Sequence, residues 1–218
     1  MSLRINDVAP NFTADSTAGT LTLHDWIGDG YAILFSHPKD FTPVCTTEFG
    51  AVAQLVPEFK KRNTKVMGVS VDSVDDHHKW KKDIAAFAGV PADFPIIDDT
   101  SLSVAKAFDM LPAEAYMPDG RTAKDSATVR TVFIIGPDKK VRLMMTYPMS
   151  VGRNFAEIVR ALHAVQKTDG APVATPANWM PGQDVIVSPG LGDDAARAKF
   201  GEIDIRLPYL RFTKDPSA

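Results

Sequence analysis

The sequence predicts an α/β protein with a main domain and a small C-terminal domain. Strand-like and helix-like runs alternate through about the first two thirds of the chain, as in a sheet whose strands are connected by crossover helices. Beyond residue 168 the composition changes to a segment rich in Gly, Pro and Ala. We therefore expect a main domain over residues 1–168 and a C-terminal domain over residues 169–218.

The amino-acid composition argues against several classes of function. Hydrophobic residues make up 44% of the 218 residues and charged residues 23%, which is typical of a globular protein. The net charge of -3 gives no broad basic surface, so we expect no nucleic-acid partner. No apolar run approaches the roughly 18 residues of a membrane helix, so we expect no membrane partner. Met1–Pro10 lacks a basic stretch followed by an apolar run, which favours a cytoplasmic location.

The first predicted elements are two central strands with a helix between them. Tyr31–Phe35 is a continuous apolar run, and Lys65–Asp72 is similar, as expected for strands covered on both faces. Thr46–Arg62 carries apolar residues at a helical period, and Pro57 is expected to kink this helix.

The next segment predicts a second helix, a short strand and a short third helix. Val74–Phe87 begins after Ser73, a good helix cap. Pro95–Ile97 is a strand candidate and Ser101–Phe108 suits a short helix. Leu111–Thr128, rich in Pro, Gly, Asp and Ala, predicts a long irregular segment.

A hairpin and a helix complete the predicted main domain. Thr131–Ile135 and Val141–Tyr147 are joined by a turn-forming stretch, and Asn154–Lys167 is an amphipathic helix that Asn154 could cap. Short strand-like pieces follow in the C-terminal domain, at Asp184–Val187 and Ile203–Arg206.

Cys45 is the single cysteine of the chain. An internal disulfide and a multi-thiolate metal site are therefore excluded, and we expect neither a metal nor a cofactor. A lone cysteine is more often a buried, inert hydrophobe. Here, however, a Pro-rich loop delivers Cys45 to the first turn of a predicted helix, where free N–H groups and the helix dipole favour a thiolate.

The residues before Cys45 each allow a chemical and a structural interpretation. Thr42 offers a hydroxyl that can donate to a bound oxygen or accept from a bound O–H group, but it could also cap the helix. Pro38 and Pro43 could shape a tight pocket or merely stiffen the loop. His37 could tune the thiolate or act as a base, or hydrogen-bond the loop.

These residues resemble the active-site motif of a known family. Pro38, Thr42 and Cys45 match the Pro-x-x-x-Thr-x-x-Cys motif of the peroxiredoxins, and the run from His37 to Glu48 is similar to their one-cysteine, AhpC/TSA-type subfamily. The likeness covers nearly the whole chain, through short matches at residues 61–63, 70–74, 136–140, 152–155, 173–176 and 209–211.

The resemblance implies a thioredoxin-like fold with a small α+β dimerisation domain at the C-terminus. It also implies that Cys45 attacks the peroxide and that Arg130 completes the catalytic set. Glu48 and Arg153 match positions that orient this arginine. Without the resemblance, Arg130 would be an ordinary strand-end charge, and Glu48 and Arg153 could equally be solvated helix-end charges.

The expected reaction is the reduction of hydrogen peroxide and organic hydroperoxides. Cys45 becomes a sulfenic acid, which an external thiol must reduce because the chain has no second cysteine. The sequence does not decide whether this reductant is glutathione, a thioredoxin-like protein or another small molecule. We expect a homodimer, with larger rings as an alternative. A competing hypothesis is a redox sensor or a holdase, because a slowly resolved sulfenic acid also suits signalling.

Two other sites are set aside. His77 and His78 are adjacent on a helix, so their side chains diverge and could not share a metal without further ligands. Some members of the resembled subfamily carry a phospholipase serine, but Gly30 stands at that position here. His24 and Asp138 match the partners of that serine and are interpreted as surface residues.

Overall fold

The computed structural model describes residues 3–116 and 127–216. They form two compact units, Met1–Phe155 and Ala156–Ala218. The expected domain boundary after residue 168 falls inside helix α5 (Phe155–Gly170), nearly all of which belongs to the second unit. No helix in the described ranges is both long and apolar enough to cross a membrane.

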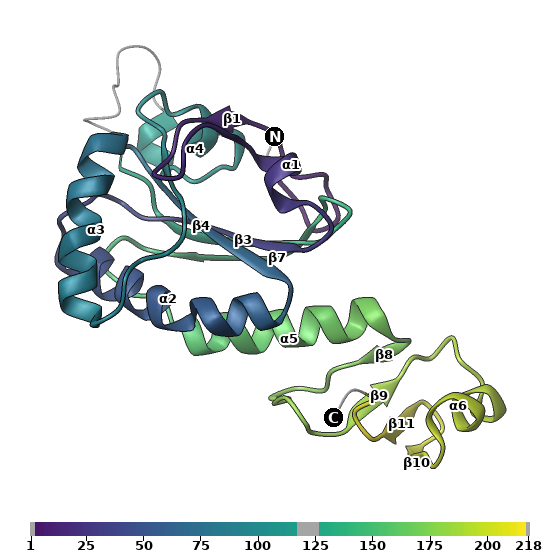
Figure 1. The fold of residues 1–218 in the computed structure, drawn as a ribbon. Coiled ribbons are helices and arrows are strands. Elements are labelled where there is room, and N and C mark those ends of the chain that lie inside the picture. Colours follow the sequence, from purple (N-terminus) through teal and green to yellow (C-terminus); the bar gives the residue numbers. More distant parts are fainter. Residues whose placement is uncertain (1–2, 117–126, 217–218) are drawn as a thin grey trace. The chain divides into compact units, whose positions relative to one another are not determined.

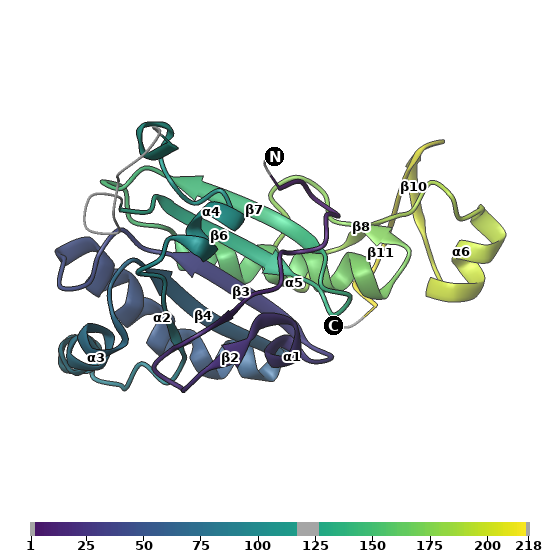
Figure 2. The same cartoon turned by 90° about the horizontal axis from the view of Figure 1, so that it is seen from above.

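The first unit is built on a five-stranded sheet with the order β5-β4-β3-β6-β7. Strands β3, β4 and β5 are parallel, whereas β6 runs antiparallel to both β3 and β7. The two predicted central strands and the predicted hairpin are confirmed, and Figure 2 shows these strands side by side. The bounds are Tyr31–Ser36 (β3), Thr64–Ser70 (β4), Ile96–Asp98 (β5), Arg130–Ile135 (β6) and Val141–Tyr147 (β7).

Helices cover both faces of this sheet (Figure 1). Ala32 and Leu34 of β3 belong to the core cluster that contains residues of α1 (Leu23–Ile27) and α4 (Ser103–Ala107). Phe35 lies on the opposite face, where its ring is 4.8 Å from that of Phe49 in α2 (Pro43–Lys61). Helix α3 (Val74–Ala88) packs beside α2. The continuous apolar runs therefore arise because both faces are buried.

Helix boundaries differ modestly from the predicted ones. Helix α2 begins three residues before the expected start, at Pro43, because proline at the first helical position has a preset φ and no N–H to lose. It continues through Pro57 to Lys61. Ser73 caps α3 as predicted, accepting a hydrogen bond from the backbone N–H of Asp76.

Several short elements were not predicted. Strands β1 (Thr13–Ala14) and β2 (Leu21–Thr22) form a two-residue pairing, too short to show a period in sequence. A 3₁₀ turn, η1 (Ala113–Tyr116), lies within the segment expected to be irregular. Residues 117–126 of that segment lie outside the described residues.

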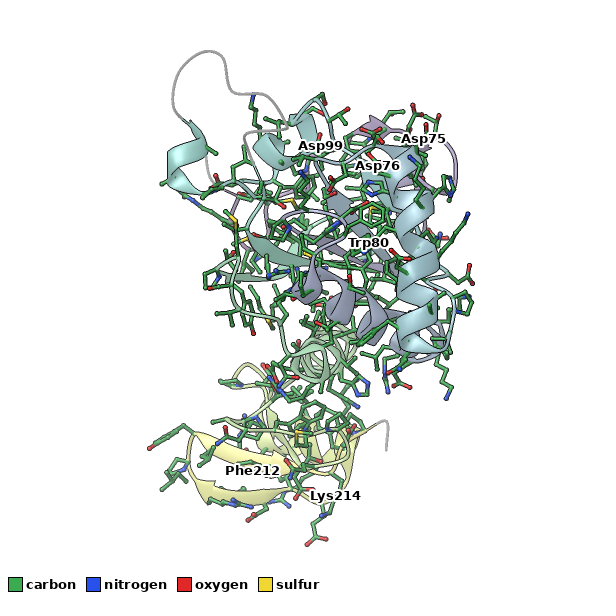
Figure 3. All side chains as sticks on the ribbon, turned by 90° about the vertical axis from the view of Figure 1, so that its left-hand side faces the viewer. Asp75, Asp76, Trp80, Asp99, Phe212 and Lys214 are labelled. Atoms are coloured by element: carbon green, nitrogen blue, oxygen red, sulfur yellow. The ribbon has the colours of Figure 1, made fainter. Side chains whose placement is uncertain are left out.

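The second unit combines α5 and α6 with a small antiparallel sheet, ordered β10-β11-β9-β8. Trp179 is its largest fully buried side chain, and its ring N–H donates to the carbonyl of Gln183. Arg206 lies over the ring of Phe212, which is labelled in Figure 3, at 4.1 Å. The bounds are Val173–Ala174 (β8), Val185–Val187 (β9), Asp193–Phe200 (α6), Asp204–Leu207 (β10) and Leu210–Thr213 (β11).

Candidate active site

Cys45 lies in the first turn of α2, directly after the loop that follows β3. Its side chain is fully buried. The helix is 19 residues long, and its first backbone N–H groups have no carbonyl partners within the helix, so this end favours an anion. The strand, loop and helix thus place the only sulfhydryl of the chain at a positive helix end.

Arg130 is the first residue of β6 and is buried, with 3% of its surface exposed. Its Nη1 donates to the Sγ of Cys45 at 3.3 Å. Its Nε donates to the carbonyl of Met149 at 2.8 Å, which fixes the plane of the guanidinium. Arg130 is therefore not a surface charge at a strand end but a buried cation in contact with the sulfur.

Glu48, one helical turn beyond Cys45, binds two arginines. It accepts from Arg130 Nη1 at 2.7 Å, and from Arg153 Nε and Nη2 at 2.9 and 2.7 Å. The backbone N–H of Arg153 also donates to it at 2.8 Å. Burial alone would raise the pKa of Glu48, but the bonds from Arg153 hold this pKa below its ordinary value. The solvated alternative for Glu48 and Arg153 is wrong.

The charges of this buried cluster are unequal. Arg130 and Arg153 bring two positive charges, and Glu48 brings one negative charge. An uncompensated charge away from water is costly, so the cluster favours one further anion. A thiolate on Cys45, in contact with Arg130, would supply it.

Thr42 occupies the cap position of α2, with an extended backbone. Its hydroxyl donates to the carbonyl of Lys39 at 2.9 Å and makes no capping hydrogen bond, so the capping interpretation is not what the structure shows. Phe41, just before it, has a positive φ of 56°, which is strained for an aromatic residue. Pro38 is buried at the start of the same loop.

His37 belongs to a buried group that sequence reasoning missed. Asp40 lies 2.7 Å from Nε2 of His37 and 2.6 Å from Nδ1 of His77. All three side chains are almost completely buried. A signal was present in the sequence, since His77, Trp80 and Ile84 follow a helical spacing and form the buried stripe of α3.

The residues matched to a phospholipase set do not form a site. His24 Nε2 lies 2.8 Å from the carbonyl of Ala9, and Asp138 pairs with Arg142. An added Cβ at Gly30 would lie 2.5 Å from the backbone oxygen of Asn63, so the backbone leaves no room for a serine.

Comparison with protein-family models gives two matches. Residues 5–144 match the AhpC/TSA family, and residues 164–202 match the C-terminal domain of 1-Cys peroxiredoxin. Together they cover the first sheet up to the middle of β7, the Cys45 loop and more than half of the second unit.

Known proteins agree over the full length. The chain is 52% identical to the mitochondrial peroxiredoxin PRX1 of Saccharomyces cerevisiae, over 97% of this chain and 81% of that protein. It is 47% identical to peroxiredoxin-6 of Rattus norvegicus, over 98% of each. A crystal structure of peroxiredoxin 6 from Arenicola marina superposes with a TM-score of 0.91 at 43% identity, covering 100% of both chains. The expected thioredoxin-like fold with a C-terminal domain is confirmed.

Proposed function

This chain belongs to the peroxiredoxin family, in its one-cysteine branch, and from that premise we propose how its own side chains act. It is a thiol-specific peroxidase, which reduces hydrogen peroxide and organic hydroperoxides through a cysteine sulfenic acid. The observation that carries the proposed roles is the contact of Arg130 Nη1 with both the Cys45 sulfur and Glu48.

The proposed first step begins with the Cys45 thiolate. Its sulfur attacks the terminal peroxide oxygen, so an S–O bond forms while the O–O bond breaks. The sulfur is oxidised to a sulfenic acid, and the departing oxygen takes a proton and leaves as water or an alcohol. Arg130 and the backbone N–H groups of the α2 start stabilise the charge that develops along the breaking bond, while the Thr42 hydroxyl, which donates its proton to the Lys39 carbonyl, offers its oxygen as an acceptor to the peroxide O–H.

Glu48, Arg153 and Pro38 support this step without touching the peroxide. Glu48 holds the Arg130 guanidinium, and Arg153 holds Glu48 while donating to the Thr131 carbonyl at 3.1 Å. Pro38 begins the loop that carries Thr42 and, being buried, restricts that loop.

The second half of the cycle needs an outside thiol. The thiol attacks the Cys45 sulfenic acid, releasing water and forming a mixed disulfide, and a second thiol then releases reduced Cys45. A structure of a yeast mitochondrial 1-Cys peroxiredoxin concerns thiol resolution through glutathione and thioredoxin systems, and that protein is 50% identical to this chain. We propose that glutathione or a thioredoxin-like protein reduces Cys45 here.

Peroxide turnover tests the proposal. The reduced protein should consume one equivalent of hydrogen peroxide rapidly, and continuous consumption should follow only when a thiol system is added. Cys45→Ser should abolish both phases, with unchanged secondary structure. Oxidation no faster than that of a free thiol contradicts the proposed roles, and a single stoichiometric event with every reductant favours the sensor hypothesis instead.

We also propose a homodimer in the cytoplasm. Support for the dimer is the edge position of β7 in the first sheet and the exposed apolar residues Ile205 and Leu207 on β10. Support for a reducing compartment is the single reactive thiol, which must return to the reduced state in each cycle. Subcellular fractionation tests the location, and recovery with mitochondria would contradict it.

A further inference from the structure

A second buried network lies outside the Cys45–Arg130–Glu48 contacts and joins three titratable side chains. Asp40 places one carboxylate oxygen on His37 and the other on His77. The remaining ring nitrogen of His77, Nε2, lies 3.0 Å from the carbonyl of Ile97. The remaining ring nitrogen of His37, Nδ1, is buried without a hydrogen-bond partner among the described residues.

These contacts fix the positions of the protons. A carbonyl only accepts, so Nε2 of His77 must carry a proton and donate it to Ile97. The close contact between His77 Nδ1 and Asp40 then needs one more proton between these two atoms, and either placement leaves the pair neutral overall. His37 must likewise donate from Nε2 to Asp40.

Nδ1 of His37 is therefore bare, which means that it carries no proton. An N–H at this atom would be a buried donor without an acceptor among the described residues, and a protonated ring would put a second positive charge into a buried cluster whose Asp40 carboxylate already pairs with His77. Burial lowers the pKa of His37 below its ordinary value, against the opposing effect of Asp40, which agrees with a neutral ring. Hydrogen bonds from both histidines hold the pKa of Asp40 below its ordinary value, although burial acts in the other direction.

The His37 ring packs against α2, the helix that carries Cys45. Its centroid is 4.5 Å from that of Phe49, which lies four residues after Cys45 and so shares its helix face. Its other side stacks on Trp80 at 5.0 Å, and Figure 3 shows Trp80 directed from α3 toward the interior. The Trp80 ring N–H donates to Thr46, whose hydroxyl donates to the carbonyl of Thr42.

We propose that His77 is a positioning residue, which acts through Asp40 to hold His37 as a neutral imidazole with its proton on Nε2 and a bare Nδ1. The function of this arrangement rests on the place of His37 in the proposed active site. A bare, buried nitrogen can accept a hydrogen bond from a peroxide or from the sulfenic acid, whereas an imidazolium cannot. Two further carboxylates act on the cluster: Asp72 accepts from the backbone N–H of Asp40 at 2.8 Å, and the charge of Asp76 interacts with that of Asp40.

The proposal predicts the effect of His77→Asn. This variant keeps an N–H donor for Asp40 but removes the group that shares a proton with it. The cluster then lacks a positive partner for Asp40, so His37 takes up a proton on Nδ1 at a higher pH than before. We expect peroxide oxidation of Cys45 to be about tenfold slower at pH 6 than at pH 8 in this variant. The unmodified protein should show no such loss.

Two further variants separate proton placement from folding. Asp40→Asn with His77→Asn removes the carboxylate as well, so His37 should return to the neutral form and the rate at pH 6 should recover. His78→Asn changes the exposed neighbour of His77 on the same helix and should leave the pH profile unchanged.

The tautomer itself can be measured without peroxide. The chain has five histidines, so ¹⁵N spectra of the imidazoles can be assigned by single substitutions. In the unmodified protein His37 Nδ1 should have the shift of an unprotonated nitrogen at pH 7. A protonated Nδ1 there, or a His77→Asn protein in which Nδ1 stays unprotonated at pH 6, overturns the inference. Absence of peroxidase activity in the unmodified protein would instead count against the proposed function.

Discussion

Glu48 is the carboxylate on which both buried arginines of the site depend. It receives four hydrogen bonds from Arg130 and Arg153, counting the backbone N–H of Arg153. The Arg153 guanidinium also lies over the rings of Phe35 and Phe155, at 5.1 and 5.5 Å, and these contacts restrict its plane. Arg130 is therefore held beside the Cys45 sulfur by Glu48 and, through Glu48, by Arg153.

Glu48→Gln should lower both stability and activity. The amide keeps the shape of the side chain but leaves two buried guanidiniums without a carboxylate, so we expect a loss of about 3 kcal/mol in the free energy of unfolding. Oxidation of Cys45 should slow about 100-fold, because Arg130 loses its anchor. Urea denaturation and stopped-flow kinetics measure the two effects. Glu157→Gln, which breaks a more exposed pair with Arg160, is the control and should change little.

The same carboxylate predicts an acid dependence of stability. The pKa of Glu48 is lower in the folded protein than its ordinary value of 4.5. The unfolded chain therefore binds more protons on acidification, and the contribution of Glu48 is complete above about pH 4.5 and lost as the pH falls through the folded pKa. The free energy of unfolding of Glu48→Gln should fall less steeply below pH 4.5 than that of the unmodified protein. Equal slopes would contradict this assignment.

At the residue scale, local sequence predicts the sulfur site better than the network behind it. Cys45 and Thr42 lie within one short motif, and the sequence predicts a helix beside them, although the helix begins three residues before the expected start. Arg130 is 85 positions away, so only the resemblance, and not spacing, connects it to Cys45. The sequence around His77 raises only the question of metal binding, because its contact with Asp40 depends on how α3 packs against the loop after β3.

At the scale of elements, the contact between β4 and α2 depends on a glycine. A Cβ added to Gly68 would lie 2.6 Å from Cζ of Phe49. Phe49 cannot easily move, because its ring is already packed against those of Phe35 and Trp80, at 4.8 and 4.7 Å. The missing side chain lets the helix that carries Cys45 approach the central strand.

Gly68→Ala should therefore destabilise the protein by about 2 kcal/mol, through overpacking at this contact. Phe49→Leu in addition should relieve part of the loss, so the two substitutions should be non-additive in a double-mutant cycle of unfolding free energies. Gly170→Ala is a matched control, since nothing lies within 4 Å of a Cβ there. Additive effects at Gly68 and Phe49 would show that the clash is relaxed elsewhere.

The sequence predicts the elements whose hydrophobic residues follow a strong period or form a continuous run. Strands β3, β4, β6 and β7 carry such runs because helices or neighbouring strands cover them. Helix α6 was missed because half of its eight residues are charged and it buries only Ala196. Strand β10 overlaps the strand-like piece expected at Ile203–Arg206, although all four of its residues are exposed.

At the scale of the whole molecule, a single cysteine makes the cycle depend on other molecules. The sulfur, its arginine and the second network all lie in the first unit, Met1–Phe155. The matched C-terminal domain lies in the second unit, whose two small apolar clusters bury few side chains. A unit of this size gains little folding free energy from burying its own apolar side chains. We therefore expect association with a second copy of the chain to stabilise it.

The exposed apolar residues of β10 and its turn test this expectation. Ile205, Leu207 and Tyr209 are 42%, 43% and 75% exposed, and an association that buries them would remove them from water. Light scattering should give a mass near twice 23.7 kDa for the unmodified protein. Ile205→Asp with Leu207→Asp should weaken the dimer at least about tenfold, since burying two carboxylates costs well over the 1.4 kcal/mol of a tenfold change. Val90→Asp, an exposed apolar position of the first unit, should leave the mass unchanged. A monomer before substitution, or a dimer unaffected by both β10 changes, would place the stabilising contact elsewhere.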